Sequence, residues 1–280
     1  MSVGAGETAD EAAGRGARRG TDDAAGRGAD GSAGRSARWG LVDVVAGVLL
    51  FVLLSALVQA LVRLPQLADQ PQVRWALEQV VAGWLPLVVV VLVACFWRGR
   101  RSLAADFGLR FSLIDLAIGL LAGLVLRAAA VGIAELARLA SGTPSTPYDG
   151  GVGPDPFWFV LTAIVAASIV TPVVEELYFR GLVLRSIENA VGGRSGFAAA
   201  VAVVGSSLLF VLFHLDGAPE TAAAVSRLVT LFVVGLVLGS LAVLTRRLGP
   251  SILTHMVFNL SVAVIDIASS AAGPTTPTLS

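Results

Sequence analysis

The feature that most constrains this chain is a series of long apolar runs that begins at residue 41 and recurs almost to the C-terminus. A helix of roughly 17–25 apolar residues is long enough to cross the hydrocarbon core of a bilayer. Of all residues, 55% are hydrophobic and 14% are charged. A soluble domain could not hide so much apolar surface, because its exterior must face water. The sequence therefore predicts an integral membrane protein surrounded by lipid.

Seven segments have the length and composition of membrane-spanning helices, which predicts an all-α, polytopic transmembrane bundle. An eighth crossing within residues 178–195 is a second reading, although that stretch carries three arginines and a glutamate, so about seven to eight spans are expected. The predicted spans are Leu41–Val62, Gln79–Trp97, Leu116–Leu136, Phe157–Val174, Phe197–Phe213, Leu228–Leu244 and Ile252–Ile267.

The arginines between these spans predict the orientation of the chain, because basic residues concentrate in cytoplasmic loops. All 20 basic residues are arginine, and most lie in the N-terminal segment or follow the second, fourth and sixth spans. The loop at 141–156 carries two aspartates and no basic residue. We therefore expect a multi-pass protein of the cell membrane with a cytoplasmic N-terminus and a C-terminus on the opposite side.

The two ends of the chain differ from its apolar middle. Residues 1–38 mix Gly, Ala, Arg and Asp with few large apolar side chains, so they are predicted to be a disordered cytoplasmic tail. The membrane domain is expected over 39–272, followed by a short tail at 273–280. A formal net charge of zero offers no electrostatic basis for binding nucleic acid. Cys95 is the single cysteine, which excludes an intramolecular disulfide.

Adjacent acids, Glu175 and Glu176, stand at the end of the fourth predicted span. An ionised side chain at the bilayer centre costs about 2.5–3.5 kcal/mol even on lenient scales, so the two acids need an explanation. On a helix, Glu176 and Arg180 lie four residues apart on one face and can pair, whereas Glu175 points about 100° away. Pro172 cannot donate to the carbonyl of Ser168, so the helix is expected to be kinked or loosened just before the acids.

Both histidines of the chain, His214 and His255, fall in apolar segments, and Asn259 lies one helical turn after His255 on the same face. A carboxylate, two imidazoles and an amide in a low-dielectric pocket suit hydrolysis. The carboxylate accepts a proton from water, while the imidazoles hold a metal ion or the developing oxyanion. The candidate catalytic residues are therefore Glu175, His214, His255 and Asn259, with Glu176 and Arg180 in supporting roles.

These motifs resemble, in order, those of the CPBP family, the CAAX-protease and bacteriocin-processing intramembrane endopeptidases also called Abi proteins. The pattern of that family is EExxxR, then FxxxH, then HxxxN. The Phe-Gly-Leu-Arg sequence at 107–110 is also similar, and the resemblance covers residues 157–262 firmly and the earlier spans loosely. The matching residues are Glu175-Glu176 with Arg180, Phe210 with His214, and His255 with Asn259.

The resemblance implies a helical membrane protease that opens toward the cytoplasm and cleaves peptides or proteins close to the membrane. Glu175 would activate water, and His214 would share that water or ligate a metal. His255 and Asn259 would complete the metal site or stabilise the oxyanion. Because two imidazoles and one carboxylate form an acceptable catalytic zinc set, zinc on Glu175, His214 and His255 is expected. A metal-free, glutamate-activated water is the alternative.

Two other functions stay open at this point. Buried acids and histidines also form the proton relays of transporters, and a membrane immunity or scaffolding protein could keep these motifs without activity.

Depth is a further difficulty, since a straight fifth span from Phe197 would leave His214 as much as about 20 Å from Glu175. Either that span is strongly tilted or 178–195 dips into the membrane, and we favour the second explanation.

Other features of the spans predict packing rather than chemistry. The pairs Gly119–Gly123 and Gly235–Gly239 have the small-xxx-small spacing that lets helices approach closely. Arg127 in the third span is expected to pair with an acid of a neighbouring helix, and Glu135 is expected to pair with Arg138 near the outer surface.

Overall fold

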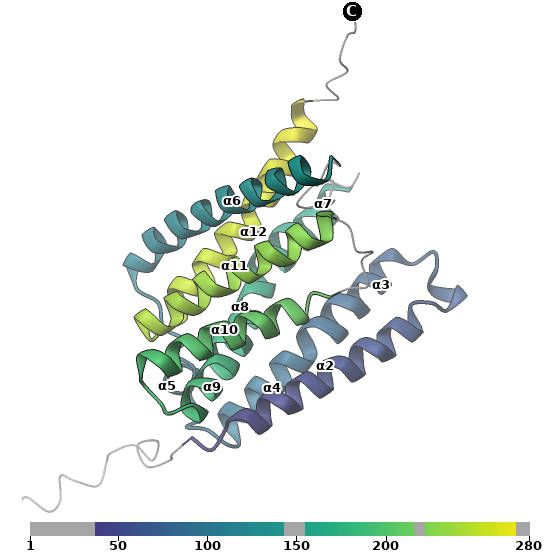
Figure 1. The fold of residues 1–280 in the computed structure, drawn as a ribbon. Helices are drawn as coiled ribbons and strands as arrows, with labels where there is room; N and C mark the ends of the chain where they lie inside the picture. Colours follow the sequence, from purple (N-terminus) through teal and green to yellow (C-terminus); the bar gives the residue numbers. More distant parts are fainter. Residues whose placement is uncertain (1–36, 143–154, 216–221, 273–280) are drawn as a thin grey trace, which may run out of the picture. The chain divides into compact units, whose positions relative to one another are not determined.

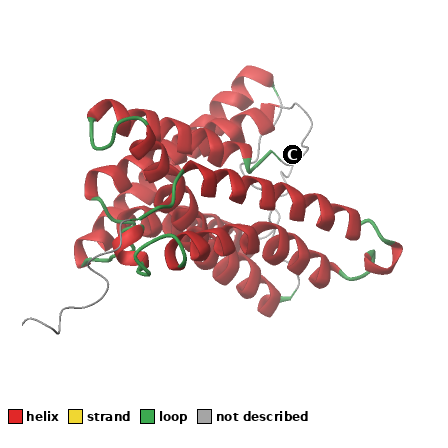
Figure 2. Cartoon of the chain, turned by 90° about the horizontal axis from the view of Figure 1, so that it is seen from below, coloured by secondary structure: helices red, strands yellow, loops and turns green. Residues whose placement is uncertain are grey.

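The computed structural model describes residues 37–142, 155–215 and 222–272, and all regular structure in these residues is helical (Figures 1 and 2). Six of the described helices are long and apolar enough to cross a membrane, and the helix Gly196–Leu212 is apolar but shorter. Together they correspond to the seven predicted spans and confirm the all-α membrane bundle. The predicted tails at 1–38 and 273–280 lie almost wholly outside the described residues.

The second and fourth membrane helices are each assembled from several consecutive helical segments. Three of these segments, η2, η3 and η4, are π-helical, a wide form that is rare in proteins and often found at functional sites. In chain order the elements are α2 (Leu41–Leu61), η1 (Pro65–Leu67), α3 (Pro71–Ala76), η2 (Leu77–Trp84), α4 (Leu85–Phe96), α5 (Leu103–Asp106), α6 (Leu113–Ser141), α7 (Pro156–Phe159), η3 (Val160–Val170), α8 (Thr171–Glu176), η4 (Leu177–Val183), α9 (Leu184–Ala190), α10 (Gly196–Leu212), α11 (Ala222–Thr245) and α12 (Gly249–Ala272).

The fourth membrane helix is longer than predicted. It runs without a break from Pro156 to Ala190 and ends where Gly192 and Gly193 adopt positive φ angles of 125° and 75°. The stretch 178–195 is therefore no separate crossing but mainly the continuation of this helix. It carries the chain about 20 Å beyond the acids. Because α10 packs back along η4 and α9, it returns His214 to the level of Glu175.

Both predicted glycine pairs lie where helices touch. A Cβ atom added to Gly119 or Gly123 of α6 would come within 2.6 Å of α12 side-chain atoms. One added to Gly235 of α11 would lie 2.8 Å from the Cβ of Ser207 in α10. Real Cβ atoms are essentially never that close to other heavy atoms, so α6–α12 and α10–α11 contacts depend on these glycines.

Arginines gather where several helices begin or end, and we call this region the arginine-rich end. The backbone N–H of Arg38 donates to the carbonyl of Arg98 over 2.7 Å, which joins the start of α2 to the end of α4. Ion pairs from Arg246 to Glu188 and from Arg247 to Asp115 tie the α11–α12 turn to α9 and α6. Arg180, predicted in this region, instead lies buried inside the bundle.

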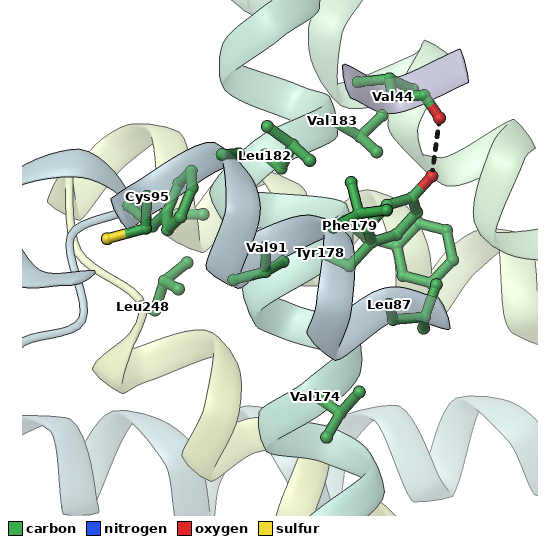
Figure 3. Packing of buried hydrophobic residues seen from close by; sticks show 14 of the residues in the cluster. Val44, Leu87, Val91, Cys95, Val174, Tyr178, Phe179, Leu182, Val183 and Leu248 are labelled. Atoms are coloured by element: carbon green, nitrogen blue, oxygen red, sulfur yellow. Dashed lines mark hydrogen bonds between the residues drawn. The ribbon is translucent and has the colours of Figure 1, made fainter. Parts of the chain in front are cut away.

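The largest apolar core lies between the arginine-rich end and the middle of the bundle (Figure 3). Tyr178 is buried there, and its hydroxyl donates to the carbonyl of Val44 over 3.0 Å. Phe107 packs against Gly181, where an added Cβ would lie 3.0 Å from the Phe107 Cβ atom. Cys95, which is fully buried, belongs to the same cluster.

Candidate active site

Three of the four candidate catalytic residues meet near the middle of the bundle. Glu175 projects from α8, His214 follows the C-terminal end of α10, and His255 lies in the second turn of α12. The Nε2 atom of His214 is 3.9 Å from one carboxylate oxygen of Glu175, and the Nε2 atom of His255 is 3.8 Å from the other. The side chains are 29%, 5% and 14% exposed for His214, His255 and Glu175. The site is thus largely screened from solvent but not sealed.

Hydrogen bonds on the far side of each ring fix its tautomer. Nδ1 of His214 lies 2.8 Å from the carbonyl oxygen of Phe210, and Nδ1 of His255 lies 3.1 Å from a carboxylate oxygen of Glu176. Because these oxygens accept, each Nδ1 carries the proton. In the neutral form of each ring, Nε2 turns a lone pair toward Glu175. Three acceptors facing one another need a shared donor, such as a water molecule or a cation.

Glu176 and Arg180 form the predicted ion pair. Their atoms are 2.9 Å apart, and both side chains are completely buried. The guanidinium of Arg180 also lies 4.7 Å from the ring centre of Phe210 and 3.4 Å from the carbonyl oxygen of Gly235. Since Glu176 also accepts from His255, the buried pair orients one imidazole of the site. The supporting role expected for both residues stays a prediction.

Asn259 does not join the other three directly. It lies one turn beyond His255, and its Nδ2 atom donates to the carbonyl of Ala167 over 2.8 Å. Pro172 explains why that carbonyl is free: in the five-residue register of η3, its missing N–H would have bonded to Ala167. In the four-residue register of an α-helix, the carbonyl left free would have been that of Ser168, as predicted. The proline thus loosens the helix as expected, by widening it rather than by a sharp kink.

Two cavities meet at His214. One, of about 240 Å³, lies among α6, η3, α11 and α12 and contains Asn259 and Arg127. The other, of about 450 Å³, lies between α2 and the segment from η2 into α4 and contains Glu175. We call them the Asn259 cavity and the Glu175 cavity. Open space therefore adjoins His214 in two directions.

The comparisons with known proteins agree with this geometry. A family model described as type II CAAX prenyl endopeptidase Rce1-like matches residues 156–261. These residues are therefore similar to that family. The matched segment contains all four candidate catalytic residues, and the predicted resemblance is confirmed over this segment. Neither the curated proteins nor the solved structures include a match to the chain.

The donor atoms of Glu175, His214 and His255 can be compared with the ligand geometry that zinc requires. The two imidazoles have suitable tautomers and partners behind them, as metal ligands do. Tetrahedral zinc with bonds of about 2.0–2.2 Å would, however, place its ligands about 3.4 Å apart. The nitrogen–oxygen separations here are 3.8 and 3.9 Å, and no group of three or more His, Cys, Asp or Glu among the described residues is arranged to hold a metal ion. The donor types fit zinc, but their spacing is too wide as it stands.

Arg127 is held differently from the prediction. Instead of an acid, it donates to the hydroxyl of Ser261 and the carbonyl of Phe258, each over 2.8 Å, and its guanidinium lies 4.3 Å from the Phe258 ring centre. No carboxylate within salt-bridge distance of Arg127 is found in the described part of the chain. The predicted Glu135–Arg138 pair is present on the exposed face of α6.

Sequence reasoning missed two groups next to the CAAX endopeptidase motifs. Thr171, one turn before Glu175, accepts hydrogen bonds from Trp84 over 3.0 Å and Gln79 over 3.4 Å. Arg227 donates to the backbone carbonyl of His214 over 2.7 Å. A polar side chain in an apolar run was the available signal in both cases, but such residues are too common near span ends to be singled out from one sequence.

Proposed function

We propose that this chain is an intramembrane endopeptidase of the CAAX type, which hydrolyses peptide bonds of membrane-associated peptides or proteins with water activated by Glu175. The observation that supports this most directly is the convergence of three acceptors on one space. A water molecule there would donate one hydrogen to Glu175 and the other to an imidazole. The bond to Glu175 turns the water oxygen into a nucleophile.

The surroundings of the two histidines suggest different roles. His214 donates its Nδ1–H to the Phe210 carbonyl, so its Nε2 is free to accept the second water hydrogen and to orient the nucleophile. His255 donates its Nδ1–H to the Glu176 carboxylate, which holds its Nε2 toward the reacting atoms. A proton on that Nε2 would let the ring donate to the oxyanion that develops on the scissile carbonyl.

Glu175 completes the proposed reaction. As the water oxygen bonds to the carbonyl carbon, the water proton moves to Glu175. Collapse of the tetrahedral intermediate breaks the carbon–nitrogen bond, and the same proton passes to the leaving amine. The second N–H of Asn259, not used by Ala167, is directed to the oxyanion in this proposal. No step requires zinc, which would supply a Lewis acid for the carbonyl if it is bound.

The proposal is tested with protein purified in detergent and a set of fluorogenic membrane peptides. Glu175→Gln, His214→Ala and His255→Ala are each expected to lower kcat/KM by about 10²–10⁴-fold, the usual contribution of a general acid or base. Glu135→Gln is a matched control, because within the described ranges this exposed acid on α6 forms an ion pair with Arg138 and with no other residue. Activity that survives all three site substitutions would dismiss the hydrolase.

The same variants distinguish the alternative functions. A scaffold or immunity protein would retain its cellular phenotype in the Glu175→Gln variant. A transporter would move solute across proteoliposomes, and its flux would fall in that variant. We further propose that the protein resides in the cell membrane with its N-terminus in the cytoplasm, because the arginine-rich end has the composition of a cytoplasmic face.

A further inference from the structure

The Glu175 cavity leads away from the arginine-rich end. At its inner end lie Glu175 and His214, which belong to the site, and at its outer end lie the exposed side chains of Gln59 and Glu78. Gln59 is in the last turn of α2, and Glu78 is near the start of η2, at the opposite end of the bundle from Arg38 and Arg98. The cavity therefore connects the site with this opposite end, which has fewer arginines, Arg63 and Arg74 among them, and which we call the arginine-poor end.

Polar side chains line this cavity although the helices that carry them are otherwise apolar. Ser55 and Gln59 are four residues apart on one face of α2, and Glu78 and Gln79 face them from η2. Polar groups in a membrane segment are costly unless they face water or one another. Their presence along one cavity indicates that water fills it, which hydrolysis requires.

The opposite direction is closed by the main core. Between Glu175 and the arginine-rich end lie buried aromatic and aliphatic side chains, including Tyr178, Phe179 and Leu182, each at most 1% exposed (Figure 3). Phe107 packs directly against Gly181 in this part of the core, so closely that a Cβ atom added to Gly181 would lie 3.0 Å from the Phe107 Cβ atom. Protein interiors packed in this way contain few voids large enough for water. A substrate cannot reach Glu175 along this direction without disrupting the core.

We propose that the site is reached through the Glu175 cavity from the arginine-poor end. Because cytoplasmic loops are the arginine-rich ones, that end is the non-cytoplasmic face. The substrates would then be polypeptide segments that emerge from, or lie on, the non-cytoplasmic side of the membrane. This differs from the cytoplasmic opening that the family resemblance implies. The substrate side rests on the proposed peptidase activity, whereas the route of access does not.

The route is tested by the accessibility of single cysteines to a membrane-impermeant, sulfonated thiol reagent. The background is Cys95→Ala, which removes the native thiol. Ser55→Cys reports on the cavity, and two exposed residues report on the ends of the bundle: Ala68 after η1 for the arginine-poor end, and Ala190 at the end of α9 for the arginine-rich end. Each cysteine is labelled in intact cells and in inside-out vesicles.

We expect Ser55→Cys and Ala68→Cys to react in intact cells, and Ala190→Cys to react only in inside-out vesicles. Labelling of Ser55→Cys from the side of Ala190→Cys would overturn the route, as would its failure to react from either side. Labelling of Ala190→Cys in intact cells would overturn the assignment of the cytoplasmic face. The same labelling pattern is expected with Glu175→Gln added. An inactive wild-type protein with the expected labelling would refute the peptidase and leave the route intact.

Discussion

Neighbouring glutamates have opposite surroundings in this protein. Glu175 is partly exposed and faces two imidazole nitrogens, whereas Glu176 is fully buried and bonded to Arg180 and His255. Burying a charge is costly unless it is paired, so each member of the Glu176–Arg180 pair depends on the other. The difference follows from helical geometry, which turns adjacent side chains about 100° apart.

Substitution of Arg180 tests this dependence. Arg180→Met would leave the Glu176 carboxylate buried without its cation, so we expect a loss of about 3–5 kcal/mol in the free energy of unfolding. A fall in the thermal unfolding midpoint in detergent measures this loss. Arg138→Met, which removes an exposed partner on α6, should leave the midpoint unchanged. An Arg180→Met protein as stable as wild type would show that the buried pair does not hold the bundle together.

Metal removal separates the two forms of the proposed chemistry. Because the donors of Glu175, His214 and His255 are spaced more widely than tetrahedral zinc needs, we expect cleavage to continue after dialysis against a chelator. Elemental analysis of the purified protein should find zinc below one equivalent. Stoichiometric zinc that disappears in His214→Ala, together with loss of activity on chelation, would instead establish the zinc-assisted form.

At the scale of elements, the π-helical segment η3 links a proline to an asparagine. Pro172 leaves the Ala167 carbonyl without a backbone donor, and Asn259 of α12 supplies one. The proline thereby ties the helix that carries Glu175 to the helix that carries His255. Part of the HxxxN motif is thus explained by packing, independently of any catalytic role of the amide.

A double-mutant cycle between these residues measures the link. Asn259→Ala leaves a carbonyl unsatisfied, so it should cost about 1–3 kcal/mol in stability. In a Pro172→Ala background the backbone regains a donor, and the cost of Asn259→Ala should fall by about 1 kcal/mol, read as a coupling energy from unfolding midpoints. Purely additive effects would contradict the link between the freed carbonyl and the amide.

Element lengths show what the sequence could and could not predict. The apolar runs identified the positions of the spans, because lipid leaves few alternatives to apolar helices. The extension of the fourth helix to Ala190 was missed, since Arg180 and Arg185 resemble loop arginines in one dimension. Arg180 is tolerated inside only because Glu176, Phe210 and Gly235 surround it, and such contacts between helices are invisible to hydropathy.

At the scale of the whole molecule, the motifs alone do not predict that Glu175 meets both histidines. Their meeting depends on the order and direction of the helices. The long fourth helix and the return of α10 bring His214 beside Glu175, although the two residues are 39 positions apart in the sequence. The π-helical widenings and the cavities also depend on how the helices pack. The motifs single out the proposed reacting groups, and the packing determines the distances between them.

The number of membrane crossings determines whether the two ends of the chain lie on the same side of the membrane. If α10 crosses the membrane along with the six long helices, the termini lie on opposite sides, and the proposed cytoplasmic face at the arginine-rich end would place the N-terminus in the cytoplasm. A green fluorescent protein, which matures in the cytoplasm, should fluoresce on the N-terminus and stay dark on the C-terminus. Alkaline phosphatase, which folds only after export, should be active on the C-terminus alone. If both termini reported the same side, α10 would not complete a crossing.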